Sequence, residues 1–305
     1  MDSQISVKNM LAELLAISHP LSPFEMPLLD AHGATLADDI SVGEEIVLQK
    51  GVRIRSPQIG LAASLGLSRL PTQPHPRVVV ISAGDDLVEP GQSIAEHEEF
   101  ETNSWMLTTA AREAGAVAYR VHAIPENHAQ LKAVIEDQLV RADIIVISGE
   151  SNDGSFELIR EVLSELGDIE SFIPNLEGSA RHCYGIIGDD GVPAITLPGD
   201  SMSAYISFEL FIRPMIRTLL GVKNVFRATV KAQVTCDIES PIGLTSLIRA
   251  LLFLSSDGSP MVTPLADQED LLSLSRAGAL ITVAADSPGY LKGELAEIII
   301  LDRSL

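Results

Sequence analysis

The sequence predicts an α/β protein. A central domain with a doubly wound, mainly parallel sheet lies between a small N-terminal segment and a C-terminal β-barrel-like domain. Short apolar, β-branched runs alternate with helix-spaced segments between residues 78 and 197. Three prolines between residues 71 and 76 precede this alternation, as expected of a linker. After Gly221, strand-like runs follow one another, separated by clusters of Gly, Pro, Ser and Asp.

The N-terminal segment, residues 1–71, begins with one predicted helix. Residues 5–18 space their apolar side chains as an amphipathic helix does, and Pro20 ends the pattern. The apolar face of this helix, from Val7 to Leu15, needs a partner surface, so we expect a dimer with two-fold symmetry.

The central domain is predicted to span residues 72–222. We expect strands at Val78–Ile81, Ala118–Ile124, Ile144–Ile147 and Val192–Leu197. We expect helices at Asn103–Ala114, Asn127–Leu139 and Ser155–Leu166. Strands that alternate with helices favour a parallel sheet with right-handed crossovers, so Val78, Ile144 and Ile195 should lie on parallel strands.

The C-terminal domain, residues 223–305, is predicted to be all-β. Its expected strands are Val225–Val234, Leu247–Leu254, Leu280–Val283 and Leu295–Leu301. Strands of this length with turn signals between them favour a small barrel.

Composition limits the possible partners and compartment. The chain has 305 residues and a formal net charge of -21, and no basic stripe interrupts it, so we expect no nucleic-acid partner. We expect no membrane partner either, because no apolar run approaches membrane-spanning length. Cys183 and Cys236 lie far apart and form no CxxC motif, which favours a reducing compartment but leaves one disulfide open. The start of the chain lacks the features of a signal peptide, so we expect a cytoplasmic protein.

Three loops follow predicted strands and carry candidate ligand-binding residues. The most informative is Thr196–Ala204, in which a Pro-Gly turn joins a buried strand to the amphipathic stretch Tyr205–Leu220. The others are Ser82–Leu87 and Ser148–Glu157. Open α/β sheets bind ligands at the carboxyl ends of their strands, where backbone N–H groups are available.

These loops resemble motifs of the MoeA/gephyrin-E family, which inserts molybdenum into molybdopterin. Leu197-Pro198-Gly199-Asp200-Ser201-Met202-Ser203-Ala204 is similar to the family's Leu-Pro-Gly-Asn-Pro-x-Ser-Ala loop. Ser82-Ala83-Gly84-Asp85-Asp86-Leu87 resembles its Ser-Thr-Gly-Asp-Glu-Leu loop. Ser148–Glu157 resembles its Gly-Gly-Val-Ser-x-Gly-Asp-x-Asp loop. The resemblance spans nearly the whole chain, apart from one family subdomain that is missing near Gly43.

The resemblance implies a site, cofactors and partners. The implied cofactor-binding residues are Ser82, Gly84, Gly149, Ser151, Asn152, Gly154, Gly178, Gly199, Asp200 and Ser203. The implied metal ligands are Asp85, Asp86 and Glu157, with Asp85 also catalytic. Mg²⁺ and molybdopterin are the implied cofactors, molybdopterin or its adenylate is the implied ligand, and the family's assembly implies a homodimer. The implied reaction inserts molybdate into adenylated molybdopterin and hydrolyses the adenylate.

The motifs also depart from the family, which keeps a second interpretation open. Glu150 replaces a Gly, Ser155 replaces an Asp, and Ser179 replaces a Lys whose charge nearby Arg181 could restore. A catalytically silent relative that binds a ligand or a protein partner would show such changes. Local structure is a further alternative: the aspartates of Ser82–Leu87 could cap a helix or form an Asx turn, and Ser148–Glu157 could be a flexible connection.

Overall fold

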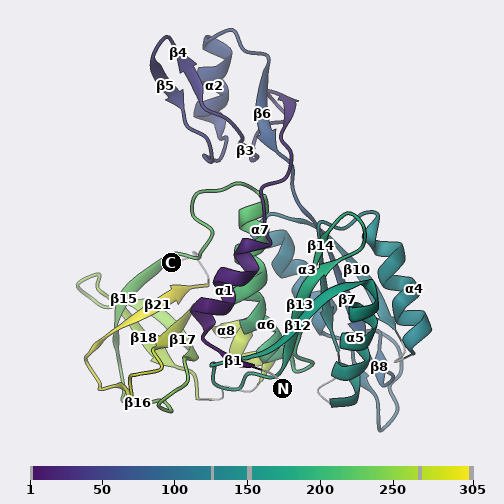
Figure 1. The fold of residues 1–305 in the computed structure, drawn as a ribbon. Helices are drawn as coiled ribbons and strands as arrows, with labels where there is room; N and C mark the ends of the chain where they lie inside the picture. The colour runs from purple at the N-terminus through teal and green to yellow at the C-terminus, as the bar shows by residue number, and fades with distance from the viewer. Residues whose placement is uncertain (1–2, 125–126, 150–152, 267–269, 302–305) are drawn as a thin grey trace.

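The computed structural model describes residues 3–124, 127–149, 153–266 and 270–301, and it places a seven-stranded sheet at the centre (Figure 1). The strand order is β1-β12-β13-β14-β11-β7-β10. The strands are β1 (Ser3–Ile5), β7 (Arg77–Ala83), β10 (Val117–Ile124), β11 (Ile144–Ser148), β12 (Gly167–Pro174), β13 (His182–Ile187) and β14 (Val192–Leu197). Among them β13 runs antiparallel to both its neighbours, while the other neighbouring pairs are parallel.

The sheet is doubly wound, as predicted. Val78 and Val80 face one core and Val79 and Ile81 face the other, because successive side chains of a strand point to opposite faces. The first core packs against α1 (Val7–Ala16), α3 (Asn103–Ala114), α6 (Ser201–Ser207), the π-helical turn η1 (Phe208–Ile212) and α7 (Arg213–Leu219). The second packs against α4 (His128–Leu139) and α5 (Asp153–Leu166). The register Ile144↔Val78 and Val146↔Ile195 confirms the predicted parallel pairing.

Strands β12 and β13 are not among those that the sequence pattern predicts. They form an antiparallel pair whose backbones approach closely at two glycines. A Cβ atom at Gly185 would lie 1.9 Å from the carbonyl oxygen of Asp168, and one at Gly167 would lie 2.0 Å from that of Ile186. Polar and apolar residues mix along β12, so hydrophobic periodicity alone does not reveal it.

Helix α1 finds its partner surface within the same chain. Met10 and Leu14 are fully buried in the first core, against η1 and α7. The Tyr184 hydroxyl donates a hydrogen bond to Glu13 Oε2 at 2.7 Å, which fixes the helix beside the sheet. Residues 3–16 therefore pack with the central α/β unit, and the apolar face of α1 gives no argument for a dimer.

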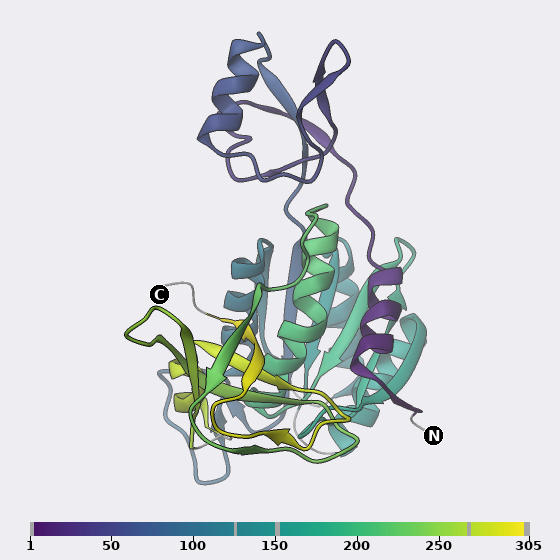
Figure 2. The same cartoon turned by 90° about the vertical axis from the view of Figure 1, so that its left-hand side faces the viewer.

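The N-terminal unit projects from the main body on two segments of chain (Figure 2). It contains the sheet β2 (Phe24–Pro27), β6 (Arg69–Gln73) and β3 (Thr35–Leu36), the hairpin β4 (Ile40–Val42) and β5 (Glu45–Leu48), and helix α2 (Ser56–Ser64). Leu36, Ile54 and Leu70 are fully buried in its small core. The hairpin turns at Gly43, whose φ of 63° is the left-handed conformation that favours glycine.

The C-terminal part forms a closed barrel, as predicted. Its strands are β15 (Thr229–Val234), β18 (Pro260–Pro264), β17 (Ser246–Leu254), β19 (Ala279–Val283) and β21 (Leu295–Ile300). Of these, β18 is additional to the four predicted strands. Smaller elements are the ribbon β16 (Ile238–Glu239) and β20 (Gly289–Tyr290), helix α8 (Leu271–Arg276), and the pair β8 (Leu87–Val88) and β9 (Glu99–Phe100) in the central unit.

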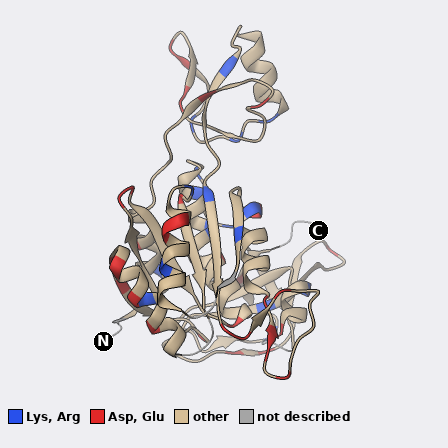
Figure 3. Cartoon of the chain, turned by 90° about the vertical axis from the view of Figure 1, so that its right-hand side faces the viewer, with Lys and Arg blue, Asp and Glu red and all other residues tan. Residues whose placement is uncertain are grey.

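Acidic residues, red in Figure 3, are spread over the helices and loops of the chain. Cys183 is buried, Cys236 is exposed, and both are free thiols.

Within the described ranges, no helix has the length and apolar character needed to cross a bilayer.

Candidate functional site

The carboxyl ends of β7, β11 and β14 meet at one edge of the sheet, next to the start of α3. A cavity of about 480 Å³ opens there, which we call the strand-end cavity. Five residues named from the sequence lie in its lining: Ser82, Asp86, Gly149, Gly199 and Asp200. The parallel topology therefore gathers loops that are more than 100 residues apart in sequence.

Asn103, the first residue of α3, ties two of these strand ends together. Its Nδ2 donates to Ser148 Oγ at 2.9 Å and to the carbonyl oxygen of Gly199 at 2.6 Å. Ser148 Oγ in turn donates to the carbonyl oxygen of Pro198 at 3.1 Å. These bonds fix the Pro-Gly turn relative to β11.

Replacing Asn103 by alanine should lower the free energy of unfolding by about 2 kcal/mol, because the buried Ser148 Oγ and the partly buried Gly199 carbonyl oxygen lose their donor. Urea denaturation of the two proteins measures this difference. Asn9→Ala, at an exposed position on α1, is the matched control and should stay within about 0.5 kcal/mol of the parent chain. A loss no larger for Asn103→Ala than for this control would contradict the role of Asn103.

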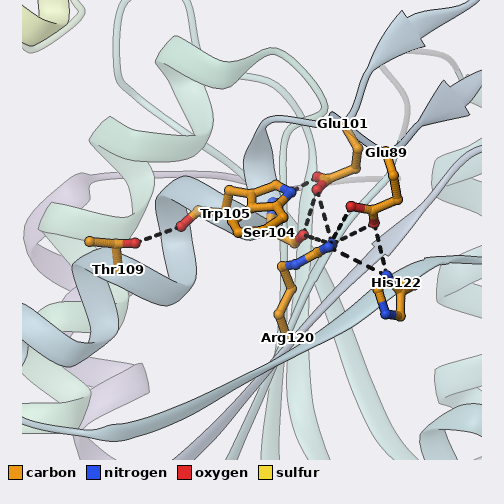
Figure 4. Close-up of polar contacts among 7 residues, drawn as sticks. All are labelled: Glu89, Glu101, Ser104, Trp105, Thr109, Arg120 and His122. Atoms are coloured by element: carbon orange, nitrogen blue, oxygen red, sulfur yellow. Dashed lines mark hydrogen bonds and ion pairs between the residues drawn. The ribbon is translucent and has the colours of Figure 1, made fainter. Parts of the chain in front are cut away.

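A partly buried ion-pair cluster supports the entrance to α3 (Figure 4). Glu101 accepts hydrogen bonds from the backbone N–H of Ser104 at 2.7 Å and from its hydroxyl at 2.5 Å, so it caps the helix. Arg120 lies 3.7 Å from Glu101 and binds both oxygens of Glu89 at 2.6 Å. The Arg120 guanidinium also stacks 4.2 Å from the centre of the Trp105 ring.

The same cluster keeps Glu89 ionised. Burial raises the pKa of Glu89, but the hydrogen bond with His122 and the charge of Arg120 outweigh burial and hold that pKa below its usual value. Because Glu101 lines the strand-end cavity, the cluster anchors one wall of it.

A second cavity, about 750 Å³ in volume, lies between the central unit and the barrel, and we call it the barrel-side cavity. Gly178, Ser179, Asp200 and Ser203 line it from the central unit. Ser203 Oγ donates to the carbonyl oxygen of Gly178 at 2.9 Å, and Asp200 Oδ1 caps α6 by accepting the Ser203 N–H at 2.9 Å. Asp200 lines both cavities, so the Pro-Gly turn separates two adjacent spaces.

Arg249, in barrel strand β17, is a candidate site residue that the sequence analysis does not identify. It lines the barrel-side cavity and is only 5% exposed, and its Nε donates to Ser273 Oγ at 3.2 Å. The signal in the sequence is a single arginine inside the apolar run Leu247–Leu254.

Two family models and several known proteins are similar to this chain. Residues 79–218 match the family model described as probable molybdopterin binding domain, and residues 231–301 match the MoeA C-terminal region (domain IV). Molybdopterin molybdenumtransferase 1 of Mycobacterium tuberculosis H37Rv is 30% identical over 270 residues, which cover 87% of this chain and 63% of that protein. Molybdopterin molybdenumtransferase 2 of the same strain is 34% identical over 219 residues, 70% of this chain and 54% of that protein.

The chain belongs to the MoeA family. It spans between half and two thirds of the length of these two relatives. Two crystal structures of molybdopterin biosynthesis MoeA proteins from Pyrococcus horikoshii share its fold. They have TM-scores of 0.82 and 0.79, each with 17% identity over 98% of this chain and all of the other.

Other residues named from the MoeA motifs are placed differently. Asp85 is exposed beside Asp86 and outside the lining of both cavities. Gly84 is buried at the end of β7, and Gly154 lies in the first turn of α5. Ser151 and Asn152 lie outside the described residues.

Gly149 has a packing role in this MoeA-family chain. A Cβ atom there would lie 2.6 Å from Ile159 Cδ1, so glycine lets the end of β11 approach α5 closely. Gly178 differs, because its φ of 69° is left-handed while a Cβ atom there would meet open space.

Glu157 is engaged by two arginines. Arg160 Nη2 lies 2.7 Å from Oε2, and Arg181 Nη1 lies 2.8 Å from Oε1. The hydrogen bond with Arg160, aided by that with Arg181, lowers the pKa of Glu157 against the effect of burial. Arg181 also stacks on Phe156, at 4.4 Å, so its charge serves Glu157 and does not replace the lysine that Ser179 lacks.

The predicted metal ligands Asp85, Asp86 and Glu157 do not come together as one group. In the part of the chain that the structure describes, no three His, Cys, Asp or Glu side chains gather as a metal-binding cluster. Mg²⁺ commonly uses one or two carboxylates together with substrate phosphates, and Asp86 and Asp200 supply two such groups at the strand-end cavity.

Proposed function

We propose that this protein acts in molybdenum cofactor biosynthesis by binding molybdopterin or its adenylate across the strand-end and barrel-side cavities. The proposed reaction is insertion of molybdate into adenylated molybdopterin with hydrolysis of the adenylate. The observation that carries the proposal is the position of Asp200. It lines both cavities, and the loops that resemble the MoeA motifs surround it.

The binding roles follow from the lining residues. Ser82 and Ser203 offer hydroxyl groups, and Arg249 offers a positive charge for an anionic group of the ligand. Asp86 and Asp200 are the carboxylates best placed to hold Mg²⁺, and bound Mg²⁺ would offset negative charge on the phosphates. Glu157 does not fit that role because two arginines already neutralise it.

The charge of the barrel-side cavity limits affinity for a phosphate-bearing ligand. Glu177, Asp200 and Glu239 line it together with Arg249, so carboxylates outnumber the cationic group there. An anionic ligand is repelled unless a cation accompanies it.

One structural feature favours a second candidate, a catalytically silent binding protein. The short hairpin turn at Gly43 lies where the MoeA resemblance places the missing subdomain. Without that subdomain the ligand would stay more accessible to water, and water weakens preorganised contacts to a transition state. We therefore expect binding with lower turnover than that of a full-length MoeA protein.

A molybdenum-insertion assay tests both candidates. Purified protein is mixed with adenylated molybdopterin, Mg²⁺ and molybdate, and binding of the same ligand is measured in parallel by calorimetry. Binding with turnover like that of a full-length MoeA protein would support the transferase and overturn the silent candidate. Binding without turnover would support the silent candidate, and absence of binding would overturn both.

Restoring the lysine charge should improve binding. Ser179→Lys is expected to raise affinity for molybdopterin by about fivefold, because it adds a positive group to the lining of an acidic cavity. Ser179→Gln is the matched control, since it is long and polar but neutral. Equal affinities of the lysine and glutamine variants in a titration would show that charge at this position is unimportant.

A further inference from the structure

A third cavity is lined by residues of α3, α7, the connection from α7 to the barrel and the N-terminal unit, with Ile300 of barrel strand β21, and its lining is strongly cationic. Its volume is about 960 Å³. The cationic residues in its lining are Arg53, Arg112, Arg213, Arg217, Lys223 and Arg227. The whole chain has 21 Lys and Arg against 42 Asp and Glu, so this concentration of positive charge is exceptional within it. We call this space the arginine cavity.

Few negative groups balance these charges. Glu113 is the acidic residue of the lining, and Glu209 lies behind it, bound to Arg227 at 2.5 and 2.7 Å and 3.8 Å from Arg213 Nε. Among the described residues at this cavity, six positive groups thus stand against two carboxylates. The carboxyl ends of α3 and α7 add roughly half a negative charge each, so positive charge remains in excess within the described residues.

Arg213 has a hydrogen-bond donor that the described residues leave without an acceptor. Its Nε is buried, and within the described structure it has no hydrogen-bond partner. Burial, together with the charge of Arg227, lowers the pKa of Arg213 below its usual value. A buried donor without an acceptor and two adjacent guanidinium groups are both stabilised when an anion binds.

The cavity also has an apolar wall. Phe226, in the segment that connects α7 to the barrel, is 57% exposed and lines the cavity together with Leu220, Val222 and Val225. An exposed aromatic ring beside arginines offers a stacking surface for a planar group. The volume lies within the range of small-molecule sites.

We propose that the arginine cavity binds a small phosphate-bearing molecule, at a site separate from the strand-end and barrel-side cavities. Guanidinium groups of Arg112, Arg213 and Arg217 bind the phosphate oxygens, since arginine matches phosphate geometry with paired donors. Phe226 packs against the planar part of a nucleoside phosphate. The site does not depend on the proposed molybdopterin function.

The position of the cavity suggests a consequence for the fold. Gly33 and Arg53 come from the N-terminal unit, Arg213 and Arg217 from α7, and Lys223 from the connection to the barrel. Figure 2 shows the upper end of α7 pointing toward the N-terminal unit. A bound anion therefore links the N-terminal unit to the main body, beside the Lys223 Nζ–Gln49 Oε1 hydrogen bond of 2.9 Å.

Calorimetric titration at low salt tests the proposal with pyrophosphate, ADP and adenosine as probes. We expect pyrophosphate and ADP to bind, and adenosine to bind at least tenfold more weakly than ADP. Arg112→Gln/Arg217→Gln should reduce the affinity for pyrophosphate at least tenfold. Lys8→Gln/Arg141→Gln is the control, since it removes two positive charges outside the cavity. It should change the affinity for pyrophosphate less than twofold. Phe226→Ala should weaken ADP binding and leave pyrophosphate binding within twofold.

Several results would overturn the proposal. The proposal is wrong if the parent chain does not bind pyrophosphate at low salt. It is also wrong if the cavity variant and the control variant lose the same affinity for pyrophosphate. A dimer that dissociates on Arg112→Gln/Arg217→Gln, seen by light scattering without phosphate binding, would instead make the cavity an interface between copies. Circular dichroism should confirm that each variant is folded. The cavity variant should keep molybdopterin affinity, so failure here is distinguishable from failure of the proposed function.

Discussion

Replacing Arg249 by alanine should weaken molybdopterin binding by about 10- to 100-fold. Arg249 is the cationic residue in the lining of the barrel-side cavity, and it is almost fully buried, so solvent screens its charge little. A hydrogen bond to a charged group contributes about 1.5–3 kcal/mol, which corresponds to this range of affinity. Titration of each protein with molybdopterin measures the effect.

Two control variants separate the charge of Arg249 from its structural role. Arg249→Lys keeps the positive charge and should recover part of the lost affinity. Ser273→Ala removes the partner of Arg249 Nε without removing charge, and it should change the affinity less than threefold. If Arg249→Ala binds molybdopterin as well as the parent chain does, the barrel does not contribute to the ligand site.

Replacing His182 should make the protein less sensitive to acid. We expect the variant to lose about 3 kcal/mol less unfolding free energy on acidification than the parent chain does. The ring is fully buried, its Nε2 lies 2.9 Å from Ser207 Oγ, and its Nδ1 lies 2.9 Å from the carbonyl oxygen of Ala180. A carbonyl oxygen only accepts, so Nδ1 carries the proton and Ser207 donates to Nε2. Burial lowers the pKa of His182 to about 4, against the weaker opposing effect of the hydrogen bond to Ala180.

The sign of the pH dependence follows from this lowered pKa. Between pH 6.5 and 4 the unfolded chain protonates His182 while the folded chain does not, so protons favour unfolding in that window. The contribution to stability is fully present above pH 6.5 and is lost as the pH falls toward 4. A fall in pKa from 6.5 to about 4 corresponds to about 3 kcal/mol.

Urea denaturation at pH 7 and at pH 4.5 tests this prediction. His182→Gln should be less stable than the parent chain at pH 7, because buried packing is lost, but it should lose less stability on acidification. His19→Gln, at an exposed position, should keep the pH dependence of the parent chain. Identical acid sensitivity of His182→Gln and the parent chain would show that this histidine does not contribute.

The order of the main elements could be predicted from local patterns. The alternation between Val78 and Leu197 identifies four strands of the sheet and the helices between them, because a side chain's burial follows the period of its element. The Pro-Gly turn, which the sequence also reveals, brings Gly199 to the lining of the strand-end cavity. The apolar face of α1 is equally visible in the sequence, but not the surface that covers it.

Other features of the site could not be predicted in this way. Arg249 belongs to barrel strand β17, and only the tertiary fold brings it into the same cavity lining as Gly178. Glu157 matches a metal-binding motif in sequence, yet the fold places two arginines against it. Charge–charge contacts of this kind join residues whose separation in sequence carries no periodic signal.

The sequence by itself determined the fold class, the order of most elements and the loops that surround Asp200, since hydrophobic periodicity and turn residues act over a few positions. Tertiary structure decided what those loops contact and where charge accumulates. Arg53, Arg112, Arg213 and Lys223 come from separate parts of the chain, and only folding brings them to one cavity. The physical reason is range: backbone preferences are set by neighbours in sequence, whereas burial and electrostatic potential depend on neighbours in space.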